Sequence, residues 1–132
     1  MSVPFERRPP TVVPQSSATR CWAAALESWM RAAGMSVVLP QEQLVDIFRA
    51  VPGALERDSE RATTEVGASL MAHFTWMNAG LFSGAQMTAD FWGERLETGY
   101  VFVWYAHRGV GHCGVIYGVT RSVVKIMDPW QG

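Results

Sequence analysis

The sequence predicts a single α+β domain in which helices come first along the chain and an antiparallel β-meander follows. Two observations lead to this prediction. Between residues 21 and 99, apolar residues recur three and four positions apart, which is the period of a helix with one buried face. After residue 100, β-branched and aromatic residues dominate short runs separated by tight turns, which is typical of strands. This order favours helices packed on a sheet.

The composition agrees with one folded domain spanning residues 1–132. Apolar residues make up 48% of the chain and charged residues 17%, and six Trp, six Phe and three Tyr argue against disorder. The net charge is −1, so no broad electrostatic field favours nucleic acid or an anionic membrane as a partner. No apolar run approaches the roughly 18 residues of a membrane span. The first ten residues lack the apolar segment of a Sec signal peptide.

The first 34 residues predict an extended arm followed by a helix. Residues 1–14 hold four prolines and are expected to be extended. The helix is expected to start at or just before Cys21, because alanine and leucine dominate from there. Gly34 is suited to end it. The residues expected on its buried face are Trp22, Leu26, Trp29 and Met30.

Three further helices are expected before residue 100. The second spans residues 41 to about 51, after a proline and before Pro-Gly. The charged stretch 54–62 is expected to be an exposed loop or helical turn. The third helix starts at Thr63 or Thr64 and ends near Gly80, and the fourth is capped by Thr88 and stopped by Gly99.

The C-terminal third predicts three antiparallel strands. Residues 100–107 and 112–120 are joined by a Gly-rich turn, and residues 123–127 follow a tight connection at Arg121-Ser122. Pro129 ends the last strand, because proline cannot extend a central ladder.

The two cysteines, Cys21 and Cys113, are too few for a disulfide scaffold and lack the spacing of a zinc site. A single disulfide, two inert thiols or one working thiol remain open. Cys21 is expected at a helix N-terminus, where unpaired backbone N–H groups and the helix dipole favour a thiolate. The alternative for Cys21 alone is a small apolar residue that starts a core helix.

His112 and Asp128 strengthen the case for a working thiol. His112 opens the second strand and Asp128 ends the third, so the hairpin brings both to the same end of the sheet. Neighbouring strands are about 4.8 Å apart, so the two side chains can hydrogen-bond. A carboxylate in that position fixes the imidazole tautomer and stabilises the imidazolium. Each residue alone is equally consistent with an ordinary turn residue.

Gln15 lies on the extended segment six residues before Cys21. A side-chain amide there can point its NH₂ group toward the thiol. Together with the Cys21 backbone N–H it would form a two-donor oxyanion hole. Its alternative is an ordinary polar loop residue.

These segments together resemble papain-like cysteine proteases. Gln15, five intervening residues and then Cys21–Ala24 resemble the glutamine-to-nucleophile segment, His112–Val119 the histidine strand, and Asp128–Gly132 the segment of the third catalytic member. The compact layout is most similar to the bacterial AvrRpt2-like effector proteases and the related C39-like peptidases. The resemblance covers residues 15–34 and 97–132. The chain is shorter than papain and lacks its Cys-Gly-Ser-Cys segment.

The resemblance implies a papain-like fold and a thiol protease, a hydrolase that forms an acyl-enzyme on Cys21 with His112 as base and Asp128 as its partner. It implies that Trp22 follows the nucleophile as in the family and that Trp130 shields the His112–Asp128 pair from water. No metal and no organic cofactor is expected. The expected substrate is a protein or peptide.

The resemblance also suggests a bacterial setting. The chain would then be an effector or toxin, secreted or injected by a specialised system, and an inhibitor or immunity protein would be a further partner. The same catalytic set also fits a deamidase, a transglutaminase, an acyltransferase or a peptidoglycan amidase. An inactive papain-like domain kept as a binding module is the non-enzymatic alternative.

Other candidates are assigned structural roles. Strand alternation predicts that Cys113 points away from the site into the core. A metal site of His107, His112 and Cys113 is disfavoured by its spacing. Arg20 is expected to lower the pKa of the thiol, to contact an acidic substrate or to be a surface charge. Trp104 and Tyr105 are expected to pack in the sheet rather than to line a cleft.

Overall fold

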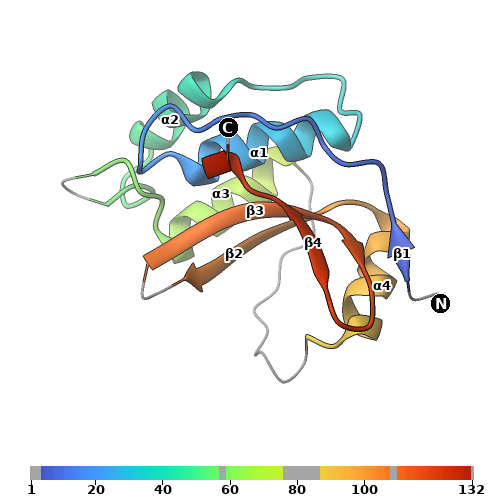
Figure 1. Ribbon diagram of the computed structural model, residues 1–132. Helices are drawn as coiled ribbons and strands as arrows, with labels where there is room; N and C mark the ends of the chain where they lie inside the picture. The colour runs from blue at the N-terminus through green and yellow to red at the C-terminus, as the bar shows by residue number, and fades with distance from the viewer. Residues whose placement is uncertain (1–3, 57–58, 76–86, 108–109, 132) are drawn as a thin grey trace.

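The computed structural model describes residues 4–56, 59–75, 87–107 and 110–131. Within this part the chain is α+β, as the sequence predicts, with four α-helices and a four-stranded antiparallel sheet. Figure 1 shows α1 (Cys21–Ala32) lying along the sheet, with α2 (Gln41–Arg49) beyond it and α4 (Ala89–Thr98) at the other end, beside the first strand. In the described residues, no helix is long and apolar enough to cross a membrane.

The helix boundaries follow the local signals in the sequence. Helix α1 begins at Cys21 as expected, and Gly34 takes the positive φ of 70° that glycine adopts easily after a helix. The Thr88 side chain caps α4 by accepting the Phe91 backbone N–H at 3.2 Å. Helix α3 spans Thr64–Thr75, and its expected end near Gly80 lies outside the described residues.

Strand β3 (Val110–Val119) is the centre of the sheet. Its register with β2 (Val101–His107) runs from His107↔Val110 to Val101↔Ile116. Strand β4 (Val124–Met127) pairs with the other edge of β3, and this pairing begins only at Val115. The three predicted strands and their order are therefore confirmed. The predicted turn before β3 is too long, because Val110 and Gly111 already pair with β2, so His112 is the third residue of β3 and does not open it.

The N-terminal arm contributes a strand that the sequence did not predict. Strand β1 (Phe5–Glu6) pairs with Val119 and Gly118 of β3, beyond Ile116, where the pairing of β3 with the first residue of β2 stops. The arm then runs along α1, where the Ser28 hydroxyl donates to the Thr11 carbonyl at 2.7 Å. It is thus tied to both the sheet and the central helix.

Two apolar cores lie on the two faces of the sheet. Alternation along β2 and β3 places Phe102 and Cys113 on the face covered by α1, and Val103 and Ile116 on the face covered by α4. On the α1 side, every residue from Cys21 to Ser28 is buried, so the first two turns of this helix are enclosed all round and not on one face as predicted, whereas Arg31 in its last turn is exposed.

The two ends of the charged stretch 54–62 are paired and partly buried, whereas an exposed loop or helical turn was expected. Its ends pair through a bridge between Leu55 and Ala62, and Ala54 and Ala62 are both buried in the core on the α1 side. The Glu56 N–H donates to the Arg61 carbonyl at 2.8 Å. We call residues 54–63 the pocket loop, because several of them line the pocket described below.

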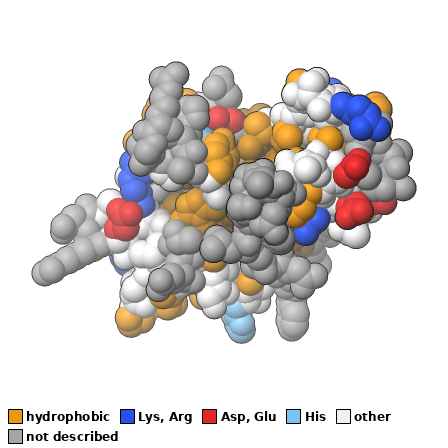
Figure 2. Space-filling model, turned by 90° about the horizontal axis from the view of Figure 1, so that it is seen from below, with side chains coloured by type: hydrophobic (Ala, Val, Ile, Leu, Met, Phe, Trp, Pro, Cys, Tyr) orange, Lys and Arg blue, Asp and Glu red, His pale blue; other side chains and the backbone are white. Residues whose placement is uncertain are grey.

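On the face shown in Figure 2, charged side chains of both signs lie in small neighbouring groups around a more apolar middle.

Candidate active site

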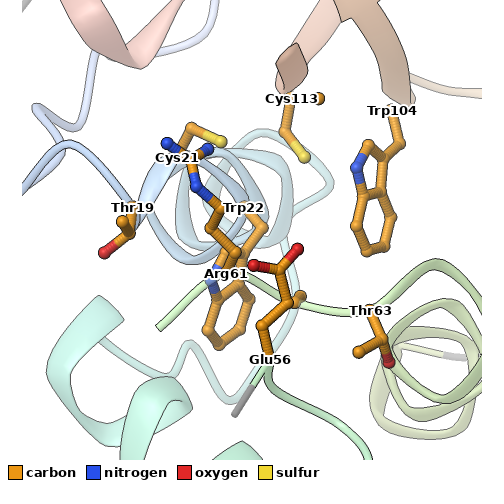
Figure 3. A pocket seen from close by; sticks show the side chains of 10 residues that line it. Thr19, Cys21, Trp22, Glu56, Arg61, Thr63, Trp104 and Cys113 are labelled. Carbon is orange, nitrogen blue, oxygen red and sulfur yellow. The ribbon is translucent and has the colours of Figure 1, made fainter. Parts of the chain in front are cut away.

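Cys21 is the first residue of α1 and lies in the wall of a pocket of about 360 Å³ (Figure 3). Only 6% of the residue is exposed. The preceding residue, Arg20, makes no side-chain cap to the helix, so the first-turn N–H groups are left to act on the sulfur. The other lining residues are Thr19, Trp22, Glu56, Arg61, Ala62, Thr63, Trp104, Gly111 and Cys113.

His112 and Asp128 form the expected hydrogen bond. Nε2 of His112 lies 2.8 Å from Oδ1 of Asp128, and the same oxygen accepts the Trp130 backbone N–H at 2.9 Å. The two side chains are 19% and 28% exposed, so the pair is largely shielded from bulk water. Because Asp128 occupies Nε2, Nδ1 is the ring nitrogen left for Cys21.

The environment keeps His112 protonated to a higher pH than an ordinary histidine. Burial lowers the pKa of His112, but the hydrogen bond and charge of Asp128, together with the Cys21 thiolate, outweigh burial and raise the pKa overall. The ring of Tyr105 packs edge-on against the imidazole, with centroids 5.8 Å apart. Tyr105 therefore restrains the histidine ring, a role that the sequence did not indicate.

The pKa of the Cys21 thiol is lowered from 9.0 to about 6. The largest cause is a hydrogen bond from the Cys113 side chain. Burial opposes it, and the positive charge of His112, the Cys113 backbone N–H and a hydrogen bond with His112 add to it. Cys21 and His112 are thus arranged to exist as a thiolate–imidazolium pair.

The prediction that Cys113 points away from the site is wrong, although it is a core thiol with 0% exposure. Alternation does send His112 and Cys113 to opposite faces of β3. However, β4 pairs with β3 only from Val115 onward, so Cys21 meets the strand at its unpaired edge. From the edge, the sulfur is reached by His112 from one face and by Cys113 from the other.

Gln15 lies at the same end of the molecule as Asp128. Its backbone N–H donates to the Pro129 carbonyl at 3.2 Å. Its side-chain NH₂ donates to the Ser17 carbonyl at 2.9 Å, and its Oε1 is buried without a hydrogen-bond partner among the described residues. Gln15 does not line the pocket described above, so its role as an oxyanion donor stays a prediction.

The two supporting tryptophans differ in their surroundings. Trp22 is buried, stacks on Phe48 with ring centroids 4.3 Å apart, and donates its indole N–H to the Glu60 carbonyl at 2.8 Å. Trp130, in the short 3₁₀ helix η2 (Pro129–Gln131), is 63% exposed. Its observed contact with the site is the backbone N–H to Asp128, and shielding by its indole stays a prediction.

Arg20 acts on the pocket loop rather than on the thiol. Its guanidinium binds both carboxylate oxygens of Glu60, at 3.0 and 2.8 Å, and Arg49 binds the same carboxylate at 2.7 Å. The three roles expected for Arg20 were to lower the thiol pKa, to contact an acidic substrate or to be a surface charge. None of them describes this double ion pair of Arg20 and Arg49 with Glu60. Trp104 also differs from expectation, because it packs on the core and lines the pocket as well.

Gln41 holds the chain around Gln15, and nothing in the sequence indicated this role. It is buried at the start of α2, donates its side-chain N–H to the Pro14 carbonyl at 2.7 Å, and accepts the Ser16 N–H at 2.9 Å. These two bonds hold the chain on either side of Gln15. The buried carboxylate of Glu27 in turn accepts the Gln41 backbone N–H at 2.7 Å.

Within the described residues, no group of three or more His, Cys, Asp or Glu side chains is placed to hold a metal ion. Comparisons with protein-family models, with curated proteins and with solved structures found no match for this chain. The chemistry of the site is therefore interpreted from its own geometry.

Proposed function

We propose that this protein is a cysteine hydrolase of the papain-like kind that cleaves peptide bonds through an acyl-enzyme on Cys21. The observation that carries the proposal is the hydrogen bond of 2.8 Å between Nε2 of His112 and Asp128, in a histidine whose positive charge lowers the pKa of the Cys21 thiol. A nucleophile, a base and a group that orients the base are the three parts that such a reaction requires.

The first half of the reaction forms the acyl-enzyme. The Cys21 thiolate attacks the carbonyl carbon of the substrate amide, a sulfur–carbon bond forms, and the carbonyl electron pair moves onto oxygen. As this tetrahedral intermediate collapses, the carbon–nitrogen bond breaks, and protonated His112 gives its proton to the leaving amine. A thioester on Cys21 and a neutral imidazole remain.

The second half releases the product. Neutral His112 takes a proton from water as the water oxygen attacks the thioester carbon. The carbon–sulfur bond then breaks, which releases the carboxylic acid product and restores the thiolate–imidazolium pair. In both halves, the negative oxygen would be held by the Cys21 backbone N–H and the Gln15 side-chain amide.

The pocket supports a peptide as the substrate. It brings polar side chains (Thr19, Glu56, Arg61 and Thr63) together with the indole of Trp104 beside the nucleophile. A mixture of hydrogen-bonding groups and one flat apolar surface suits a peptide segment, which carries backbone polar groups and side chains of both kinds.

The test is a mass-spectrometric comparison of a protein extract exposed to the wild type or to Cys21→Ala. New peptide termini found only with the wild type support the proposal. Glutamine converted to glutamate, or new isopeptide links, would identify a deamidase or a transglutaminase and replace it. Product formation that persists in Cys21→Ala would remove Cys21 from the mechanism altogether. Purified peptidoglycan, treated in parallel, tests the amidase alternative.

An inactive binding module makes a different prediction for the thiol itself. In that case Cys21 would react with iodoacetamide as a buried, ordinary cysteine, only at alkaline pH. An activated nucleophile is alkylated at mildly acidic pH, well before Cys113.

A further inference from the structure

Among the described residues that line the pocket, Cys113 is a second free thiol, and the reaction described above does not use it. It is fully buried on β3, directly after His112, and it lines the same pocket as Cys21. Figure 3 shows the sulfur atoms of both cysteines on the same side of the pocket, with the Cys21 sulfur directed toward Cys113. Both cysteines are free thiols.

The position of Cys21 at the edge of β3 explains why two groups of Cys113 reach it. Hydrogen bonding to the backbone N–H and to the side chain of Cys113 lowers the pKa of Cys21, and the Cys113 side chain lies on the face of the sheet covered by α1. His112 approaches from the opposite face. The sulfur is thus surrounded by donors on three sides of one strand edge.

The two thiols have opposite tendencies to ionise. Burial raises the pKa of Cys113 well above its ordinary value, and the negative charge on Cys21 raises it further, so Cys113 keeps its proton. A thiol that stays protonated can only donate to a neighbouring thiolate. A thiolate as buried as Cys21 needs such donors, since few water molecules reach it.

We propose that Cys113 is a positioning residue for the reaction, whose thiol donates a hydrogen bond that stabilises and orients the Cys21 thiolate. The inference rests on the proposed function of Cys21 as the nucleophile. It assigns to Cys113 the part of an additional donor that acts on the sulfur before substrate binds, separate from the donors that hold the oxyanion.

The test measures the rate at which iodoacetamide alkylates Cys21, from mildly acidic to mildly alkaline pH, by peptide-resolved mass spectrometry. The protein is kept reduced so that both thiols stay free. In the wild type, we expect the midpoint of the rate profile near the Cys21 pKa of about 6. In Cys113→Ala the midpoint should rise by about one pH unit, which lowers the alkylation rate about fivefold at the wild-type midpoint and about tenfold well below it.

Cys113→Ser is the matched rescue variant, because serine is close to cysteine in shape and restores a donor. Its midpoint should stay near that of the wild type. A Cys113→Ser midpoint that rises as far as that of Cys113→Ala would assign the effect to lost packing and overturn the proposal. If Cys113→Ala does not fold, Cys113→Val fills the space without a donor and is expected to show the same rise.

Val115→Ala controls for a loosened core. Val115 is fully buried, lies two residues further along the same face of β3, and belongs to the same apolar core as Cys113. Its truncation should lower the thermal midpoint but leave the Cys21 alkylation midpoint in place. An equal pH shift in Val115→Ala would contradict a specific role for Cys113.

The experiment also separates this proposal from the proposed function. A wild-type midpoint near that of a free cysteine would mean that Cys21 is not activated at all, and the proposed function would fail. A wild-type midpoint near the expected value that does not move in Cys113→Ala would leave the nucleophile in place and remove only the role of Cys113.

Discussion

Nε2 of His112 is held 2.8 Å from Oδ1 of Asp128, and that oxygen also accepts the Trp130 backbone N–H. The carboxylate is therefore held by two groups, the imidazole of His112 in β3 and the backbone N–H of Trp130 in η2, after β4. This double attachment orients the imidazole so that its remaining nitrogen faces Cys21. It also explains why the pKa of His112 is raised despite burial.

Asp128→Ala is expected to lower the pKa of His112, because it removes the hydrogen bond and the charge that oppose burial. Catalysis should fall more than tenfold, since the base loses its orientation. The pKa is measured by NMR titration of the ring protons, assigned with His112→Gln. Asp128→Asn keeps a hydrogen-bond acceptor without the charge, so its His112 pKa and its catalytic rate should lie between those of the wild type and those of Asp128→Ala. An unchanged titration in Asp128→Ala would contradict this coupling.

The rate of peptide hydrolysis should be bell-shaped in pH. The reactive form needs Cys21 ionised and His112 protonated. Activity should therefore rise as pH increases through the Cys21 pKa of about 6, and fall as pH passes the raised pKa of His112, which lies above 6.5. Alkylation of Cys21 needs only the thiolate, so it should rise at the same pH and not fall again. Activity that keeps rising at alkaline pH would show that protonated His112 is not required.

Much of the fold is predictable because its signals are local. The start of α1 at Cys21 follows from the change to alanine and leucine, and the start of α4 follows from the capping residue Thr88. The expected proximity of His112 and Asp128 required only a tight hairpin. Each of these inferences uses residues that are close together in the sequence.

The features that the sequence did not reveal depend on distant contacts. Strand β1 has only two residues, and it forms because β3 extends past the end of β2 and leaves an edge to pair with. Strand alternation predicts that Cys113 faces away from the site because it separates Cys113 from His112, but both cysteines line the same pocket. The short pairing of β4 leaves the strand edge open, and this can be seen only in the assembled sheet.

Gln15→Ala should lower kcat by about 10²–10³-fold with little change in KM, if its amide holds the oxyanion in the transition state. The effect on folding should be small, since the described side-chain bond is a single one, from its NH₂ to the Ser17 carbonyl, worth about 1 kcal/mol. Steady-state kinetics on a peptide found in the extract screen, with urea unfolding alongside, provide the measurement. A normal kcat in Gln15→Ala would exclude it from the oxyanion hole.

Gln41→Ala tests whether the chain around Gln15 must be held in place. The substitution removes the bonds to the Pro14 carbonyl and the Ser16 N–H, at a cost in unfolding free energy of about 2 kcal/mol. It should also lower kcat, because Gln15 loses its support. In the double variant with Gln15→Ala, kcat should fall little below that of Gln15→Ala alone. Fully additive losses would mean that Gln41 acts on stability and not through Gln15.

Glu60→Gln should loosen the pocket loop, because the carboxylate joins Arg20 at the start of α1 to Arg49 of α2. The hydrogen bonds and charges of the two arginines lower the pKa of Glu60, so its ionised form stabilises the fold above its ordinary pKa of 4.5. This stabilisation is lost as pH falls through the lowered pKa. At neutral pH the variant should lose about 1 kcal/mol of unfolding free energy, and in acid the difference should vanish. Urea unfolding followed by tryptophan fluorescence measures the unfolding free energy at neutral and at acid pH.

Asp46→Asn is the matched control. The Asp46 carboxylate lies 3.3 Å from the Arg49 guanidinium but is 74% exposed, so this substitution should change stability little. If Glu60→Gln loses as much unfolding free energy in acid as at neutral pH, the charge of Glu60 contributes nothing to its interaction with Arg20 and Arg49.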